Sequence, residues 1–568
     1  MRSNWIAAAL LALALSQSAT AQGVAQYGSG DGGSRYHPDA TYLSQGWTRE
    51  DVQLWYHLSQ GTVFMPAEWF VSLEQASGNE LFASPDHLAR LGFLPNPPSE
   101  TNPLGLPVGF SLRDLDFADN DNLQHYQNWK GRWVGFTCAA CHTGQINFHG
   151  QTIRIDGGSA HLDIEGFGDE LSAALAATSA SAPKFQRFAA RVLALGVNIT
   201  PDALQQSFAT FLHDGAARNS LFEAGQLAAP QDPTRSGLGR LDAVHRGGNL
   251  LLSAPLGEVK NYVPTTAPVR YPMIWDTPYL DWVLYNASIR QPMTRNVIED
   301  LGVGAPIEPA TLLTDNIKHG VLMDNLVQIH QLLTKLESPA WPEHLLGRID
   351  RPLAEQGSAV FAQRCSGCHS TIDRTTHRSG DVPSDAPPPT ITVKVVPLDE
   401  IGTDPRQAQN FAARMVDLEK IGGPAQMPYM AAAQTVAGNV VQQWAAQSPD
   451  NASKEQEVDT GRPNEFRGPQ AYRARPLNGL WASPPYLHNG SVPSLYELLL
   501  PPAQRSHSFY IGSWEFDPKR VGLAVGSPFP GAFLFDTRLP GNSNAGHNYG
   551  TDLTDPERAA LIEYLKTL

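Results

Sequence analysis

All four cysteines of the chain lie in two five-residue motifs, and each motif ends in a histidine. Both motifs have the spacing CxxCH, which is the attachment pattern of c-type haem. Two thiols on one helical turn can add to the two vinyl groups of a porphyrin, and the adjacent histidine then reaches the iron. The sequence therefore predicts two covalently bound haems c, with these attachment residues and proximal ligands: Cys138, Cys141 and His142 for the first, and Cys365, Cys368 and His369 for the second.

Other uses of paired cysteines fit this sequence less well. Four cysteines in an exported chain would normally indicate two disulfides. A thioredoxin-like redox pair needs no following histidine and would rarely occur twice, and a disulfide within one turn or a zinc site is weaker still. Covalent haem is the interpretation that accounts for all four cysteines and both histidines.

The chemistry of each haem depends on its sixth ligand, since an electron-transfer haem has both axial positions filled and a catalytic haem keeps one open. For the second haem, His547 lies in a Gly- and Asn-rich loop just before the C-terminal segment, where a backbone can approach a porphyrin closely. His488 is a second candidate. Met427 and Met430 are competing thioether ligands, and spacing alone favours Met427 as much as His547. For the first haem, no downstream His or Met is clearly placed to close the iron.

Helical patterns surround the second motif. Gly357, Phe361 and Cys365 recur every four residues, which predicts one face of a helix leading into the haem. Near the end of the chain, Thr554 and Glu557 have the spacing of a capping box, and apolar residues then recur at helical spacing to Leu568. A helix entering CxxCH and an apolar terminal helix crossing it are typical of a cytochrome c domain. Residues 351–568 are therefore predicted to form one haem domain, with loops at 381–389 and 447–462.

The first motif lies in a larger region, residues 22–350. Residues 169–195 and 315–336 have helical spacing, whereas residues 237–304 are rich in Pro, Gly, Trp and Tyr and show no clear period. The predicted fold class is mainly α, with two cytochrome c-type haem domains, long irregular loops and helical insertions.

Composition and charge limit the function classes. The 568 residues contain 41 Lys and Arg against 56 Asp and Glu, a net charge of −15, which argues against a nucleic-acid partner. Residues 1–21 combine a basic start, a short apolar run and an Ala-Thr-Ala ending, and are predicted to be a signal peptide cleaved before Gln22. No later stretch reaches about 18 apolar residues, so no membrane span is predicted. We expect a periplasmic or secreted protein.

Several stretches resemble a known family. The order of two CxxCH motifs around a long middle segment, followed by residues 481–493 (WASPPYLHNGSVP), resembles the dihaem cytochrome c peroxidase superfamily. The chain is most similar to its rubber-oxygenase-like branch, which includes rubber oxygenases and periplasmic fatty-acid dioxygenases. The supporting stretches are 239–243 (GRLDA), 268–278 (PVRYPMIWDTP), 401–405 (IGTDP) and 541–547 (GNSNAGH). The resemblance extends over most of the chain after the predicted signal peptide.

The resemblance implies roles for individual residues. His142 would be the proximal ligand of a catalytic haem whose distal side binds dioxygen in an apolar pocket. His369 would be the proximal ligand of the second haem and His547 its sixth ligand, which favours His547 over Met427. A Trp between the two haems is a feature of the family, and Trp275 is its best match. The analogy with dihaem peroxidases also admits a structural calcium ion between the domains, but no loop of this sequence has the pattern of a specific calcium site.

Three functions remain open at the level of the sequence. The favoured one is an oxygenase that adds dioxygen to a carbon–carbon double bond of a lipid-like alkene, polyisoprene or an unsaturated fatty acid, at the N-terminal haem. The alternative is a peroxidase that reduces hydrogen peroxide with an external electron-donor cytochrome and needs a distal acid or base, for which Asp163, Glu165 and Glu258 are candidates. A pure electron carrier is the third, and it would not need about 330 residues around its first haem.

Overall fold

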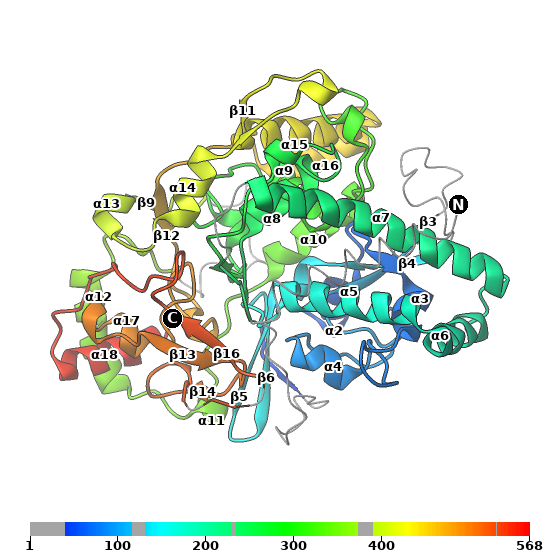
Figure 1. The fold of residues 1–568 in the computed structure, drawn as a ribbon. Helices are drawn as coiled ribbons and strands as arrows, with labels where there is room; N and C mark the ends of the chain where they lie inside the picture. Colours follow the sequence, from blue (N-terminus) through cyan, green and yellow to red (C-terminus); the bar gives the residue numbers. More distant parts are fainter. Residues whose placement is uncertain (1–39, 116–130, 229–233, 373–389, 527, 530) are drawn as a thin grey trace.

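The structure is a computed structural model that describes residues 40–115, 131–228, 234–372, 390–526, 528–529 and 531–568, without the side chains of 217–219. The predicted signal peptide and the predicted loop at 381–389 lie outside the described residues. Figure 1 shows helices α12, α17 and α18 gathered at one end of the molecule and helices α3, α5 and α6 at the other. A long hairpin, β5 with β6, lies between these two groups.

Helices occur throughout the described chain. The α-helices are α2 (Arg49–His57), α3 (Ala67–Ser72), α4 (Pro85–Arg90), α5 (Ile164–Ala180), α6 (Ala182–Ala194), α7 (Pro201–Ala228), α8 (Ala243–Leu252), α9 (Pro292–Val303), α10 (Met323–Lys335), α11 (Glu343–Leu346), α12 (Arg351–Arg364), α13 (Leu398–Ile401), α14 (Arg406–Ala413), α15 (Tyr429–Ala446), α16 (Pro449–Asp459), α17 (Leu495–Leu498) and α18 (Asp555–Leu565). Short 3₁₀ helices are η2 (Cys138–Ala140), η3 (Val259–Asn261), η4 (Thr277–Tyr279), η5 (Pro309–Thr311), η6 (Glu419–Ile421), η7 (Leu480–Ala482) and η8 (Pro502–Gln504).

The strands form several small sheets. Two of them have three strands, in the orders β1-β6-β5 and β2-β4-β3, and the others are two-stranded. The strands are β1 (Thr41–Tyr42), β2 (Met65–Pro66), β3 (Phe110–Leu115), β4 (Gly131–Phe136), β5 (Thr143–Phe148), β6 (Gln151–Asp156), β7 (Arg240–Leu241), β8 (Val269–Arg270), β9 (Lys394–Pro397), β10 (Met415–Val416), β11 (Met427–Pro428), β12 (Ala471–Ala474), β13 (Ser508–Ile511), β14 (Phe516–Asp517), β15 (Gly522–Leu523) and β16 (Phe533–Asp536).

The prediction of a mainly α fold is therefore wrong. The described residues are 42% helical and 14% strand, which is a mixed α/β architecture. The difference is largest around the first CxxCH motif, which lies between strands β4 and β5 instead of at the end of a helix. These strands are rich in aromatic and β-branched residues, which favour a pleated, half-buried surface. The turn between β5 and β6 is formed by His149 and Gly150, both with positive φ, as a two-residue hairpin turn requires.

The predicted helix pair around the second motif is present. Helix α12 runs into Cys365, and α18 begins with the capping box of Thr554 and Glu557. The helices cross closely at Gly357, where an added Cβ would lie 2.0 Å from the carbonyl oxygen of Ala560. The rings of Phe361 and Tyr564 meet beside this crossing with centroids 5.2 Å apart. Glycine is required there because any side chain would push α18 away from α12.

The predicted helices of the N-terminal region are present in altered form. The helix expected over 169–195 is two helices, α5 and α6, separated at Ser181. Pro183 explains the break, since a proline is accepted in the first turn of a helix but disfavours the helical conformation in the residue before it. The helix expected over 315–336 begins only at Met323, because the preceding residues form turns and a bridge between Ile307 and His319.

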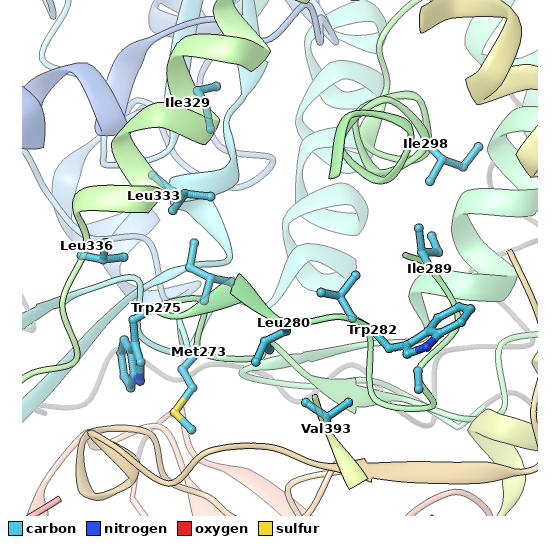
Figure 2. Packing of buried hydrophobic residues seen from close by; sticks show 14 of the residues in the cluster. Met273, Trp275, Leu280, Trp282, Ile289, Ile298, Ile329, Leu333, Leu336 and Val393 are labelled. Carbon is cyan, nitrogen blue, oxygen red and sulfur yellow. The ribbon is translucent and has the colours of Figure 1, made fainter. Parts of the chain in front are cut away.

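One large cluster of buried hydrophobic residues extends from Trp55 to Leu568 and includes Ile153 of β6 as well as Phe361 of α12. Figure 2 shows a part of this cluster, with Ile329 and Leu333 of α10 in the same packed region as Met273 and Trp275. The regions that carry the two CxxCH motifs thus share one core, and a boundary near residue 350 stays a prediction. Within the described ranges, no helix is long and apolar enough to cross a membrane.

Candidate active site

The first CxxCH motif forms a tight turn between two strands. Cys138 opens the 3₁₀ helix η2, which is capped by the Thr137 hydroxyl accepting from the backbone N–H of Ala139. None of the four cysteines forms a disulfide. Burial raises the pKa of the Cys141 thiol to about 12, so it is protonated at neutral pH. The turn therefore presents two thiols and a histidine from one short segment, as attachment to a single porphyrin requires.

His142 is held by one backbone carbonyl. Its Nδ1 donates to the carbonyl oxygen of Pro272 over 2.7 Å. Because a carbonyl can only accept, this bond places the proton on Nδ1 and leaves the Nε2 lone pair available to a metal. Burial lowers the pKa of His142 to about 4, so the ring is neutral near pH 7. A neutral, oriented imidazole is the form that binds iron.

Cys138, Cys141 and His142 line one large cavity of about 950 Å³. This is the upper part of the size range of ligand and cofactor sites. Its walls come from segments far apart in the sequence and are mostly hydrophobic, including Phe64, Leu251, Ile298, Ile329, Leu333 and Ala433. Among the residues that line it, His142 is the one histidine. The thiols, the oriented imidazole and the space beside them fit a covalently attached haem.

Helix α9 contributes ionisable side chains to the wall of this cavity. Glu299 lines it with a side chain that is 46% exposed, although the rest of α9 is almost entirely buried. Partial desolvation at the cavity wall raises the pKa of Glu299, whereas Arg295, whose Nε lies 4.0 Å from its carboxylate, lowers it. The neighbouring Asp300 is fully buried and its pKa is raised well above the usual range by desolvation. Helix α9 thus brings two carboxyl groups, those of Glu299 and Asp300, and the guanidinium of Arg295 to the cavity.

The second CxxCH motif presents its histidine in the same way as the first. Helix α12 ends at Arg364, and the next residues turn so that His369 Nδ1 donates to the carbonyl oxygen of Arg475 over 2.9 Å. Burial lowers the pKa of His369 as well. Both proximal histidines are therefore neutral, with Nδ1 bound to a carbonyl and Nε2 available to a metal.

The imidazole of His547 lies opposite that of His369. The two ring centroids are 6.3 Å apart. A bond from an imidazole nitrogen to a metal is about 2 Å long, and the nitrogen lies about 1 Å from the ring centre, so two imidazoles on opposite sides of one metal have centres about 6 Å apart. Burial, and to a smaller extent His369, lowers the pKa of His547 to about 3. The pair therefore fits two axial ligands of one iron.

The loop that carries His547 is held from several sides. Gly546 has a positive φ, and an added Cβ would lie 2.1 Å from the carbonyl carbon of Gly402. The backbone N–H of His547 donates to Ile401 over 2.8 Å. Arg505 donates to the carbonyl oxygens of Asn544, Gly546 and His547. This support fixes the direction of the imidazole without any contribution from its own side chain.

Asn489 ties the same loop to the segment 481–493. Its amide donates to the carbonyl oxygens of Gly541 and Ser543, and the Ser491 hydroxyl donates to Ser543 as well. The motif residues between 481 and 493 therefore support the loop of His547. His488, the second candidate ligand from the sequence, is instead buried and stacked on Tyr472 with ring centroids 4.1 Å apart.

The candidate methionines lie elsewhere. Met430, in the first turn of α15, lines the cavity of the first motif. Met427 belongs to the short strand β11, which pairs with β10. Neither methionine lies opposite His369 in the way that His547 does.

Trp275 lies between the segments that hold the two proximal histidines. It is fully buried, and its indole N–H donates to the carbonyl oxygen of Asn478 over 2.8 Å. The Asn478 side chain in turn exchanges two hydrogen bonds with the backbone of Ile372, three residues after His369. On the other side, Trp275 follows three residues after Pro272, the acceptor for His142. The indole is thus placed between the two motifs.

The carboxylates that the sequence analysis considered as distal acids have structural partners. Asp163 caps α5 by accepting from Gly166, and Glu165 accepts from the backbone and hydroxyl of Ser236. Glu258 caps η3 and lies 3.4 Å from Lys420. The sequence analysis missed Arg295, Glu299 and Asp300, which line the cavity from α9. Arg295 and Glu299 have the i, i+4 spacing of a helical ion pair, which does not by itself indicate a cavity.

The described residues contain no group of three or more His, Cys, Asp or Glu side chains that would hold a metal ion. A structural calcium ion therefore has no such acidic cluster within the described ranges. The candidate metal ligands are the histidines of the two motifs and His547.

Comparison with known proteins supports a haem protein. A RoxA-like, cytochrome c-like family model matches residues 471–510, which include Arg475, Asn489 and Arg505. A cytochrome c-like domain binds haem c covalently, and a RoxA-like one indicates a haem-dependent oxidoreductase related to rubber oxygenases. The matched segment is the one that accepts from His369 and supports the loop of His547.

Two relatives come from Sinorhizobium fredii (strain NBRC 101917 / NGR234). "Uncharacterized protein y4iM" is 27% identical over 323 residues, which cover 52% of this chain and 63% of that protein. "Uncharacterized protein y4iJ" is 37% identical over 572 residues, which cover 93% of each chain. Because this similarity extends over nearly the whole length of both proteins, the chain belongs to the same family as y4iJ, within which residues 471–510 are a RoxA-like, cytochrome c-like segment.

Proposed function

We propose that this protein is a dihaem c-type oxygenase that adds dioxygen to a carbon–carbon double bond of a lipid-like alkene. The observation that carries the proposal is the contrast between the two motifs. His369 faces His547, which would fill both axial positions of one haem, whereas His142 faces a large and mostly hydrophobic cavity. A haem with both positions filled suits electron transfer, and a haem with an open position beside an apolar cavity suits catalysis.

The residues around the cavity have identifiable tasks. Cys138 and Cys141 would hold the first haem by its vinyl groups, and Pro272 keeps His142 oriented toward the iron. When bound, the haem supplies the iron chemistry that activates dioxygen. Hydrophobic walls such as Leu251, Ile298 and Leu333 exclude water and accept a hydrocarbon chain. An apolar wall also withholds the protons that would favour cleavage of the O–O bond.

The substrate class follows from the shape and chemistry of the cavity. A volume of about 950 Å³ with mostly hydrophobic walls accommodates the attached porphyrin together with a segment of an apolar chain. Polyisoprene and an unsaturated fatty acid both offer such a segment with a double bond. The net charge of −15 supports the absence of a nucleic-acid partner. A periplasmic or secreted location is part of the proposal, since c-type haem is attached outside the cytoplasm.

One observation favours a second function. Glu299 and Arg295 bring an acid and a cation to the cavity, and the pKa of Glu299 is raised by partial desolvation. A peroxidase needs such a group to move a proton between the oxygens of hydrogen peroxide. In that case an electron-donor cytochrome would deliver electrons through the haem of His369 and His547.

Oxygen consumption distinguishes the two functions. The purified chain with both haems is given oleate or cis-polyisoprene without peroxide or reductant, and products are analysed by mass spectrometry. The proposal predicts dioxygen uptake and oxygenated products, and a variant with Cys138→Ser and Cys141→Ser gives neither. Absence of uptake with both substrates, together with rapid peroxide consumption in the presence of a reduced donor, would replace the oxygenase by the peroxidase.

A further inference from the structure

Three arginines gather beside the cavity of the first motif, and two of them, Arg270 and Arg473, line it. Arg270 of β8 is only 5% exposed, and Arg473 of β12 lines the cavity together with it. Arg475, two residues later, donates to the carbonyl oxygens of Met273 and Trp275. Two carboxylates act on the three arginines electrostatically, Asp276 on Arg475 and Asp281 on Arg473, so the group keeps a net positive charge. Positive charge in a protein interior is costly unless an anion compensates it.

The arginines leave hydrogen-bond donors unused at the cavity. Arg270 directs Nη1 to Ser159 and Ser483, but its Nε has no partner. Arg473 directs Nε to the carbonyl oxygen of Leu284, but its buried Nη1 has no partner either. Buried donors normally have a hydrogen-bond partner, and a ligand in the cavity would supply one to these two nitrogens.

A tyrosine hydroxyl completes the group. Tyr285 lines the same cavity, its backbone carbonyl accepts from the N–H of Arg473 over 2.9 Å, and its buried hydroxyl interacts with Arg270. The pKa of Tyr285 is raised by burial and lowered by Arg270, Arg475 and Arg473. The arginines also repel one another. The pKa of Arg475 is lowered to about 9, first by burial and next by the positive charge of Arg473. Two guanidinium edges and a hydroxyl form a recognition site for a planar anion with two oxygens.

We propose that Arg270, Arg473 and Tyr285 form a carboxylate-binding site in the wall of the cavity. Two carboxylates can reach it: a propionate of the haem at His142, or the head group of a fatty-acid substrate. Both present the same chemistry, two oxygens that accept from the free donors. The inference rests on the proposed binding of a haem at Cys138, Cys141 and His142.

The position of the site favours the propionate. Arg270 precedes by two residues Pro272, whose carbonyl holds the proximal ring of His142. Arg475 donates to Met273, the next residue along. The site therefore lies beside the segment that holds the proximal ligand, whereas a substrate approaches the opposite, open face of the haem. A propionate paired there would add its negative charge to the three arginines.

The test uses the full-length protein with both haems and two variants. Arg473→Gln removes one guanidinium, and Tyr285→Phe removes only the hydroxyl and keeps the packing of the ring. Arg348→Gln is the matched control, because Arg348 is exposed in the loop after α11. Haem content per chain is measured first, followed by a redox titration of each haem without substrate, and then by binding of oleate and of methyl oleate.

For a bound propionate, Arg473→Gln and Tyr285→Phe lower the midpoint potential of the haem at His142, because less positive charge and fewer donors face the propionate. Arg473→Lys restores part of the shift, and oleate binding is unchanged. For a bound fatty acid, the same variants weaken oleate binding about 10-fold or more, methyl oleate binds equally to all variants, and the midpoint potential without oleate is unchanged.

The inference is overturned if variants with full haem content match the Arg348→Gln control in both potential and oleate binding. Failure of the proposed function gives a different result. If the unmodified chain carries no haem at the first motif, the proposed haem site is wrong. If it carries haem but shows no oxygenase turnover, the carboxylate site can still be tested, because the midpoint potential and oleate binding are measured without turnover.

Discussion

Arg475 connects the two proximal histidines. Its carbonyl oxygen accepts from His369 Nδ1 over 2.9 Å, and its guanidinium donates over 2.6 Å to the carbonyl oxygen of Met273. Met273 is bonded through one peptide unit to Pro272, which accepts from His142. The two candidate iron ligands are thus joined by a short path of hydrogen bonds and covalent bonds, and Trp275 lies in the same connection.

Each pair of cysteines should account for one haem. A variant with Cys138→Ser and Cys141→Ser, and another with Cys365→Ser and Cys368→Ser, should each lose one of two covalently bound haems, because the thiols of each motif hold a single porphyrin. Haem content is measured as pyridine haemochrome per chain and as intact mass under denaturing conditions. Retention of two covalent haems in either variant would contradict the assignment.

His547 should determine the spin state of the second haem. His547→Gly should convert that haem from low-spin to high-spin, because one axial ligand is removed, and added imidazole should restore the low-spin spectrum. His547→Met should keep it low-spin and raise its midpoint potential. Electron paramagnetic resonance and redox titration measure both effects.

Met427→Leu is the matched comparison for His547, since Met427 is the competing ligand from the sequence. It should leave the low-spin signal and the midpoint potential unchanged, because Met427 belongs to β11 and does not face His369. Loss of the low-spin signal in Met427→Leu, with His547→Gly unaffected, would reverse the assignment of the sixth ligand.

Glu299 should separate the oxygenase from the peroxidase. If the cavity performs peroxide chemistry, Glu299→Gln should lower peroxide turnover about 100-fold or more, since a general acid or base is lost. If it adds dioxygen to an alkene, the variant should keep most of its oxygen uptake with oleate. Glu457→Gln, at an exposed position of α16, is the control for loss of a surface charge. An equal loss of both activities would mean that Glu299 serves the structure of the cavity.

Glu74 should make stability depend on pH. Its hydrogen bonds with Arg187, followed by those with Arg191, hold the pKa of Glu74 at about 2, below the ordinary value of 4.5. A lowered pKa stabilises the folded state above about pH 4.5, and this contribution is lost as the pH falls through about 2. Glu74→Gln should therefore lower the free energy of unfolding by about 1–3 kcal/mol near pH 7, and by much less near pH 2.

Denaturant unfolding followed by tryptophan fluorescence measures this difference. Glu223→Gln, at an exposed position of α7, is the control and should change stability little at either pH. A constant difference between Glu74→Gln and the unmodified chain from pH 7 to pH 2 would contradict the role of the ion pairs.

The sequence predicts those parts of the protein that depend on local patterns. The spacing of Gly357 and Phe361 predicted α12, and the capping box at Thr554 predicted the start of α18, because both signals lie within one or two helical turns. The strands on either side of the first motif were missed, because they are short and their pairing partners, such as Ile153 for Ile146, are only defined once the hairpin has formed.

The same distinction holds for the site. The cysteine motifs are local and could be found directly. Arg270 and Arg473 meet at Tyr285 only in the folded chain, and nothing in their own surroundings in the sequence links them. Glu299 was missed because an i, i+4 pair with Arg295 is common on helices and does not show that α9 directs it to the cavity. Long-range contacts of this kind have no counterpart in a local pattern.

The most direct test of the central claim uses dioxygen labelled with a heavy isotope of oxygen. The full-length protein with both haems is incubated with oleate or cis-polyisoprene under labelled dioxygen, without peroxide or reductant, and the products are analysed by mass spectrometry. The proposed function predicts products that carry the label from dioxygen, and none from the variant with Cys138→Ser and Cys141→Ser. Unlabelled substrate after prolonged incubation, together with rapid turnover of hydrogen peroxide by the same preparation with a reduced donor, would contradict it.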